Sequence, residues 1–192
     1  MPGVLSKNFI ALTAFSCALG LNAAAVAERE ILGVSMPEAV SAAGRELRLN
    51  GMWVFKEKTF FKVYVVGLYL EKPTADERAA ISTDEAKRIV LVMLRDVSRD
   101  VFVQAVETAI MRNSGLAMPS LRARLDLLEQ ALPALKKGNV LDFTYLPGAG
   151  TLMHGQGQAM TIQGKDFADA LFSAWLGSKP VNAALKRKLL GG

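Results

Sequence analysis

The stretch LRLNGMWVFKEKTFFKVYVVGLYLE, from Leu47 to Glu71, is the part of the chain richest in β-branched and aromatic residues. Such residues favour strands. From Phe60 to Leu70 apolar side chains occupy both alternating sets of positions, which is typical of a strand buried on both faces. The polar pairs and triplets at Asn50-Gly51 and 56–58 predict tight turns. We therefore expect short strands here, with helices on one face of the sheet and another element, or a ligand, on the other.

The rest of the chain alternates between blocks of strand pattern and blocks of helix pattern. Residues 87–94 and 140–146 predict further strands, and 151–154 pairs with 158–163 across a glycine-rich turn. Helical spacing follows Ser98 as N-cap up to residue 113, and a second helix is predicted from Pro119 to Leu135, with Gly138 after its end. This order indicates an α+β fold with an antiparallel sheet.

Two shorter signals complete the helical pattern. Asp166 is predicted to cap a third helix, which contains an apolar stripe and ends at Gly177. Pro180 is predicted to start a last helix. Together with the two helices before residue 140, these would form one helical layer over the sheet.

Residues 1–27 have the pattern of a cleavable signal peptide. Lys7 precedes an apolar run, and Ala25-Val26-Ala27 forms a small-x-small cleavage site. The run is shorter than the roughly 20 apolar residues that span a bilayer. We expect a mature chain of residues 28–192, a single domain, in the periplasm or secreted and without an integral membrane span. Lipid attachment at Cys17, inside this segment, is the alternative.

Composition excludes several classes of function. The mature chain has no cysteine, which removes disulfides, thiolate metal sites and a cysteine nucleophile. Its net charge is +4, since Lys7 supplies one of the formal +5. The only basic run, 186–188, has no interleaved aromatic residues, so we expect no nucleic-acid partner.

Motifs for metal, cofactor or nucleophilic chemistry are also missing from the sequence. His154 is the single histidine, and no Asp or Glu cluster has ligand spacing, so we expect no metal. Neither a G-x-S-x-G elbow nor a phosphate-binding Gly-Lys-Ser/Thr occurs. We therefore expect no cofactor and no catalytic residue.

A cationic cluster in the organising stretch is the candidate ligand-binding site. Lys56, Lys58, Lys62 and Tyr64 share one parity, so an extended backbone would project them to one side. An ammonium and a phenol converging in an apolar cleft would hold a carboxylate or a phenolate. Lys56 and Lys58 could equally solubilise a turn. Lys62 lies inside an apolar strand, where an unpaired charge is costly unless it reaches water or an anion.

An ordered set of short motifs resembles the bacterial chalcone isomerase-like proteins over essentially the whole mature chain. The motifs are Asn50-Gly51, Phe61-Lys62-Val63-Tyr64, Leu68-Tyr69-Leu70, Leu94-Arg95-Asp96-Val97-Ser98, Tyr145-Leu146-Pro147-Gly148, Asp166-Phe167-Ala168-Asp169-Ala170 and Trp175-Leu176-Gly177. The resemblance implies an open-faced β-sandwich of chalcone isomerase type, an antiparallel sheet with a helical layer on one face. The superfamily includes plant chalcone isomerases and plastid relatives that bind fatty acids without chemistry.

The isomerase's active residues do not carry over to this chain. The arginine that grips the phenolate lies in an Arg-x-Lys pattern in the bacterial relatives, and here the positions read 56–58, Lys-Glu-Lys. The resemblance places Tyr64 where the plant enzyme has a threonine, as in the fatty-acid binders. Phe102, Ala105 and Ala109 stand where the enzyme's helix carries tyrosine, lysine and asparagine. Without these hydrogen bonds to a developing anion, most of the acceleration should be lost.

The sequence therefore predicts a non-catalytic exported protein that binds a fatty acid or a similar amphipathic anion. The apolar cleft beside the helix bearing Phe102 would take the tail, and Lys56 with Tyr64 the head. Two alternatives stay open. One is an isomerase or lyase for a small phenolic or unsaturated substrate, with Tyr64 as acid or base. The other is an envelope module whose cleft receives a partner protein.

Overall fold

The computed structural model describes residues 27–58, 60–114, 118–132 and 134–192. The predicted signal peptide, apart from Ala27, lies outside these residues. The elements are β1 (Glu28–Ile31), β2 (Val34–Pro37), β3 (Ala39–Ala42), β4 (Arg45–Glu57), β5 (Phe61–Leu70), α1 (Glu77–Ser82), β6 (Lys87–Met93), α2 (Arg99–Ser114), α3 (Met118–Ala131), β7 (Val140–Leu146), β8 (Gly150–Gly155), β9 (Gln158–Ile162), α4 (Lys165–Leu176) and α5 (Ala183–Leu189).

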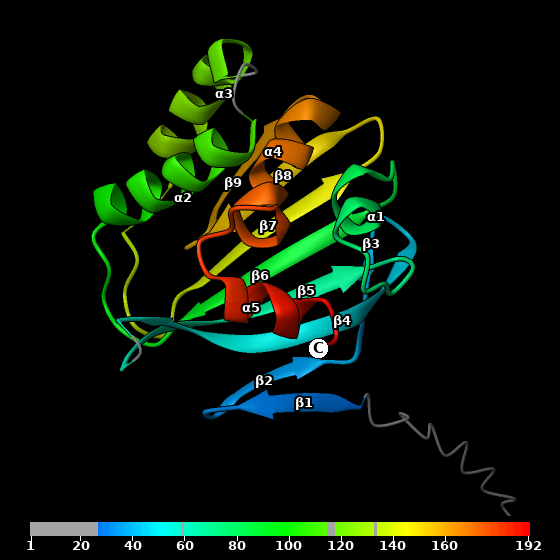
Figure 1. Cartoon of the computed structure of the whole chain (residues 1–192), viewed down its shortest axis with the longest axis vertical. Coiled ribbons are helices and arrows are strands. Elements are labelled where there is room, and N and C mark those ends of the chain that lie inside the picture. The colour runs from blue at the N-terminus through cyan, green and yellow to red at the C-terminus, as the bar shows by residue number, and fades with distance from the viewer. Residues whose placement is uncertain (1–26, 59, 115–117, 133) are drawn as a thin grey trace, which may run out of the picture.

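Seven strands form one antiparallel sheet in the order β3-β4-β5-β6-β7-β8-β9. Every neighbour in the sheet is also a neighbour in the chain. Helix α1 lies between β5 and β6, α2 and α3 lie between β6 and β7, and α4 and α5 follow β9. Figure 1 shows the sheet curled beneath a layer that contains α1, α2, α4 and α5, with α3 packed beside α2. The strands and helices predicted as blocks thus assemble into the expected α+β fold.

Strand β5 is buried on both faces, as its pattern predicts. Val66 and Leu68 belong to the large core under the helices, and Val65 and Tyr69 belong to a second, smaller core on the other face. A separate hairpin of β1 and β2 contributes to this second core: Tyr69 Oη donates a hydrogen bond of 3.0 Å to the Pro37 carbonyl. The element on the second face is therefore, at least at this end of the sheet, the N-terminal hairpin.

The predicted turn at Asn50-Gly51 is wrong, because β4 runs through it as one long strand. The register shifts by one residue between Leu49 and Gly51, which makes Asn50 the extra residue of a β-bulge. Its side-chain amide donates to the Thr74 carbonyl, accepts from the Thr74 N–H and donates to the Leu189 carbonyl at 2.8 Å. Asn50 therefore links α5 to the sheet, and the chain does not reverse here.

Two helix boundaries also differ from the prediction. Helix α3 ends at Ala131, well before Leu135, which lies in an isolated bridge with Val97. The sequence Leu132-Pro133 explains the early end, because a proline disfavours helical geometry in the residue before it. The last helix begins at Ala183, after Asn182 as N-cap, and not at Pro180.

The predicted N-cap Asp166 lies two residues after the N-cap that the structure has. The N-cap of α4 is Gly164, which has a φ of 105° and no side chain to cap with. Asp166 lies in the first turn and receives both terminal nitrogens of Arg124, at 2.7 and 2.6 Å. This carboxylate therefore joins α3 to α4 from inside the first turn, and the N-cap position itself has no side-chain cap.

Gly51 lies where the backbone of α5 packs closely on the sheet. A Cβ there would lie 2.3 Å from the Lys188 carbonyl oxygen and 2.4 Å from that of Leu189. Gly67 is the matched comparison, because its Cβ would meet the sulfur of the flexible Met36 side chain at 2.5 Å.

We predict that Gly51→Ala lowers the free energy of unfolding by about 1–3 kcal/mol, the usual penalty for overpacking. Gly67→Ala should lose less, since a thioether end moves more easily than helix backbone. Urea unfolding followed by circular dichroism measures both variants. A Gly51→Ala protein as stable as Gly67→Ala would contradict the close packing of α5 on β4.

Candidate ligand-binding cavity

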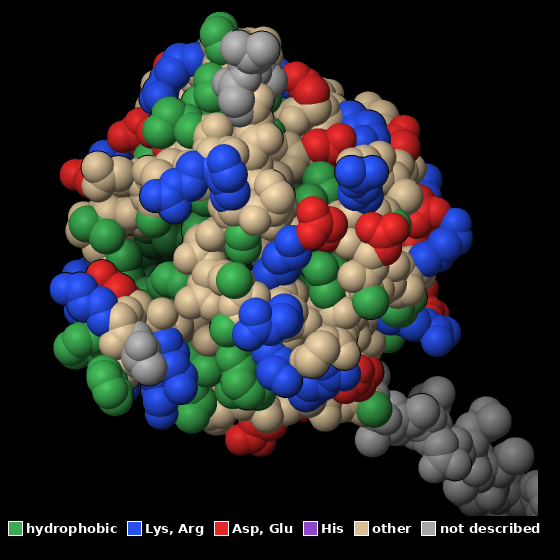
Figure 2. Space-filling view, in the orientation of Figure 1, with side chains coloured by type: hydrophobic (Ala, Val, Ile, Leu, Met, Phe, Trp, Pro, Cys, Tyr) green, Lys and Arg blue, Asp and Glu red, His purple; other side chains and the backbone are tan. Residues whose placement is uncertain are grey.

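An apolar cavity of about 540 Å³ lies between α2 and the adjoining ends of β4 and β5. Figure 2 shows a hollow floored by hydrophobic side chains at this place, with basic side chains near its rim. The sheet contributes the rings of Phe55 and Tyr64, which are register partners and stack with centroids 4.8 Å apart. Helix α2 contributes Phe102, Ala105 and other residues along one face. The volume of the cavity is within the usual range for small-molecule sites.

A second bulge shapes the floor of this cavity. Phe55 pairs with Tyr64, whereas the next residue, Lys56, pairs with Lys62, so Val63 is the extra residue. Val63 and Tyr64 both line the cavity. The bulge therefore interrupts the strict alternation on which the shared parity of Lys62 and Tyr64 depends.

Tyr64 is buried and its phenol is held by one bond. The indole Nε1 of Trp175, in α4, donates to its Oη at 3.2 Å. Burial raises the pKa of Tyr64 far above its ordinary value, and the bond from Trp175 offsets this only in part. Among the described residues, none accepts the hydroxyl hydrogen of Tyr64. The phenol is thus neutral at physiological pH and retains one unused donor.

The cavity has an arginine toward each end of α2. Arg95 precedes the helix and Arg112 lies in its last turn, and both line the cavity. Neither arginine side chain forms an ion pair or hydrogen bond with another residue in the described part of the chain. From Val101 to Arg112 the helix rises about 16 Å at 1.5 Å per residue.

The two ends differ in their surroundings. Val181 lines the cavity with Arg112, and its N–H donates to the Ala174 carbonyl at 2.8 Å, next to Trp175. The Arg112 end therefore adjoins α4, the helix whose Trp175 holds the phenol oxygen of Tyr64. The Arg95 end also contains the carboxylates of Glu57 and Asp96.

The structure brings together part of the site predicted from the sequence. Tyr64 and Phe102 both line the cavity. Lys56, Lys58 and Lys62 are exposed and are not among its lining residues. Lys56 follows Phe55, which faces Tyr64, so alternation directs it to the opposite face, and Lys58 lies in the turn with a φ of 46°. A ligand-binding role for the three lysines stays a prediction.

The sequence pattern did not identify Arg95 and Arg112 as residues of the site. Arg95 lies in a motif that resembles the family, but it follows a strand end and looks like a solvated loop residue. Arg112 occupies a polar position in an amphipathic helix, where a charge usually faces water. Only the folded geometry distinguishes a cation at a cavity rim from one in open solvent.

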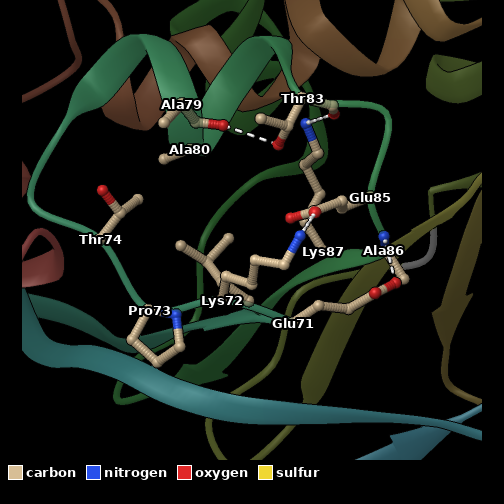
Figure 3. Close-up of a pocket in the computed structure, with 11 residues that line it drawn as sticks. Glu71, Lys72, Pro73, Thr74, Ala79, Ala80, Thr83, Glu85, Ala86 and Lys87 are labelled. Carbon is tan, nitrogen blue, oxygen red and sulfur yellow. Dashed lines mark hydrogen bonds and ion pairs between the residues drawn. The ribbon is translucent and has the colours of Figure 1, made fainter.

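A second cavity, of about 320 Å³, lies between α1 and the ends of β5 and β6 (Figure 3). Its buried polar group is Lys87, whose side chain is only 1% exposed. The Lys87 amine donates to the carbonyls of Ile81 and Thr83 at the end of α1, and it lies 3.9 Å from an Asp169 oxygen. These contacts bind α1 to the sheet.

Burial lowers the pKa of Lys87 to about 8, and the nearby Asp169 carboxylate opposes this effect only in part. An unfolded lysine has a pKa of about 10.4. Between these values the unfolded chain binds more protons than the folded chain, so the free energy of unfolding rises with pH. Below about pH 8 both states are charged, and the burial penalty is fully present.

We predict that, from about pH 7 to pH 9.5, the free energy of unfolding of wild type rises by about 1–2 kcal/mol more than that of Lys87→Met. The neutral amine can still donate two hydrogen bonds to the α1 carbonyls, so relief of the charge leaves those contacts intact. Urea unfolding at the two pH values measures the difference. An equal pH dependence in the two proteins would contradict a buried, proton-releasing Lys87.

Other kinds of site find no support in the described ranges. Between residues 27 and 192, apart from the gaps given above, no cluster of His, Cys, Asp or Glu could hold a metal ion. Within the same limits, no helix is long and apolar enough to cross a membrane.

A curled antiparallel sheet with a helical layer on one face defines an open-faced β-sandwich of chalcone isomerase type. The chain belongs to the chalcone isomerase-like family, whose model matches residues 28–191. Its fold is similar to that of a fatty-acid binding protein of Arabidopsis thaliana, with a TM-score of 0.63 and 16% sequence identity. The match covers 82% of this chain and 92% of the plant protein. A search of the curated proteins gave no match.

Proposed function

We propose that this protein binds a fatty acid or a similar amphipathic anion in the α2 cavity and performs no chemistry on it. The observation that carries the proposal is an apolar cavity lined both by Arg112, whose side chain has no ion-pair partner among the described residues, and by Tyr64, whose hydroxyl has an unused donor. The name of the structurally similar plant protein, a fatty-acid binding protein, agrees with this proposal. Export, to the periplasm or as a secreted protein, is part of the proposal and rests on the pattern of residues 1–27 alone.

The acyl chain would lie along α2, against the apolar side chains between its two ends. Phe55, Val63 and Phe102 would provide contact area on opposite walls. The length of α2 between Val101 and Arg112, roughly 16 Å, sets the length of the cavity wall and suits an extended chain of about a dozen carbons. Burial of that chain would supply most of the binding free energy.

The carboxylate would lie at the Arg112 end. There a guanidinium could pair with it, and the hydroxyl of Tyr64 could donate its unused hydrogen. At the Arg95 end, the carboxylate of Glu57 would repel an anion, whereas that of Asp96 is already paired with Lys136 at 3.0 Å. Charge therefore favours one orientation of the ligand.

The raised pKa of Tyr64 supports binding over catalysis. A phenol that keeps its proton throughout the physiological range is a poor general base, because its deprotonated form is hardly populated. It is nevertheless a good donor for a carboxylate that is already ionised. The raised pKa therefore argues against a lyase that uses Tyr64 as its base, and the alternative of Tyr64 as an acid stays open.

We predict that Arg112→Gln weakens fatty-acid binding by about tenfold to a hundredfold, the range of a hydrogen bond to a charged group. Arg95→Gln is the matched control and should change affinity by less than about threefold. Titration calorimetry with laurate in vesicle-free buffer measures both. Wild-type protein that binds no laurate would contradict the proposed function, and a larger effect for Arg95→Gln would contradict the proposed orientation.

Two further variants separate the phenol from the lysines in the same assay. Tyr64→Phe keeps the ring stack and removes the donor, so affinity should fall by roughly two- to tenfold. Lys56→Gln should leave the affinity unchanged, because Lys56 is not a lining residue. A strong loss in Lys56→Gln would instead support the pairing of Lys56 with Tyr64 predicted from the sequence.

A further inference from the structure

The turn between β4 and β5 exposes two large aromatic side chains side by side in sequence. Phe60 is 84% exposed, the largest value among the large hydrophobic residues of the described part, and Phe61 is 55% exposed. Lys56, Lys58 and Lys62 flank them and are also exposed. Figure 2 shows hydrophobic and basic side chains gathered at this end of the molecule. Exposed aromatics concentrated in one turn are unusual for a surface that meets only water.

The same hairpin forms one wall of the α2 cavity. Glu57 and Val63, on either side of the turn, both line that cavity. A partner surface that contacts the β4–β5 turn would therefore lie next to the cavity. Of the charged residues in the turn, only Glu57 is acidic, so three lysines and one glutamate give a net charge of +2.

Further basic and aromatic groups lie along the same strand. Trp53 of β4 is 38% exposed, and the Lys188 ammonium lies 5.4 Å from its ring centroid. Arg187 is exposed beside Lys188 on α5. Exposed basic side chains therefore also lie on α5, next to β4.

We propose that the β4–β5 hairpin docks on an anionic lipid bilayer, with Phe60 and Phe61 in the interface and the flanking lysines on the headgroups. Aromatic side chains concentrate at the membrane interface, and each lysine near an anionic surface adds to the attraction. Lysine stems can lie along the apolar boundary while their ammonium groups reach the phosphates. This inference rests on the proposed function, because a bilayer is the phase from which the cavity would take its fatty acid.

Co-sedimentation of the full mature chain with vesicles tests the docking. The protein should bind phosphatidylcholine vesicles that contain phosphatidylglycerol and bind pure phosphatidylcholine far more weakly. Replacing Lys56, Lys58 and Lys62 together by Gln should lower the apparent affinity on the order of a hundredfold, at about fivefold for each lysine. Phe60→Ser with Phe61→Ser should lower it at least tenfold.

Matched substitutions elsewhere control for charge and hydrophobicity. Gln at Arg78, Lys137 and Lys179 removes the same charge from other exposed positions, and Leu127→Ser removes an exposed apolar side chain from α3. Both controls should bind anionic vesicles within about threefold of wild type, because surface charge acts within a Debye length of about 10 Å. If the controls lose as much affinity as the hairpin variants, the attraction is diffuse and the proposal is overturned.

A fluorescent reporter locates the contact. In Phe60→Trp the emission should shift to the blue and be quenched by brominated lipid when anionic vesicles are added, whereas Leu127→Trp should change in neither respect. No shift in Phe60→Trp would overturn the docking and leave the exposed aromatics for a partner protein.

Laurate binding in vesicle-free buffer separates this inference from the proposed function. The hairpin variants should bind laurate as wild type does, since none of the five substituted residues lines the cavity. Lost vesicle binding with retained laurate binding supports the hairpin as a membrane contact. Laurate binding without any vesicle binding by wild type would overturn the docking alone.

Discussion

The hydrogen bond from Trp175 to Tyr64 is the contact on which the proposed site depends. It joins α4 to the sheet in a place where both side chains are buried, and an unmade bond there would leave two polar groups without partners. Because the indole can only donate, the phenol oxygen must accept, and its own hydrogen is directed elsewhere. The packing of the core thereby prepares a neutral donor at the inner wall of the cavity.

The β-bulges decide which side chains accompany that donor. A single extra residue at Val63 keeps Tyr64 and Phe55 in contact while Lys62 pairs with Lys56 beyond them. The cations near the cavity are consequently arginines from the flanks of α2, and the lysines are left on the outside of the hairpin. The one-residue bulge thus directs the apolar side chains to the cavity and the basic side chains to the outer surface.

Much of the fold could be predicted from residue patterns. The two-sided burial of β5 follows from apolar residues at both parities, and the helix after Ser98 follows from its periodicity. The predictions that failed concern local structure. The residue types of Asn50-Gly51 favour a turn, but the Asn50 amide forms hydrogen bonds with Thr74 and Leu189, and the strand continues through the pair.

The site was harder to predict than the fold. Tyr64 and Phe102 could be placed because a polar group in an apolar strand and an apolar residue in a helix are both visible in sequence. The lysines could not be placed, since a bulge reverses the facing of residues beyond it and leaves no mark in composition. The arginines could not be recognised, because a charge on a helix surface looks the same beside a cavity as in open water.

The central claim is that the space between α2 and the sheet is a ligand cavity. Ala105 lines it and is exposed, so Ala105→Trp should fill it without disturbing the core, while Ala159→Trp adds the same ring to an exposed position on β9. Native mass spectrometry with added laurate tests the claim most directly. The account predicts one bound fatty acid in wild type and in Ala159→Trp, and none in Ala105→Trp. Equal occupancy in all three proteins, or none in wild type, would contradict it.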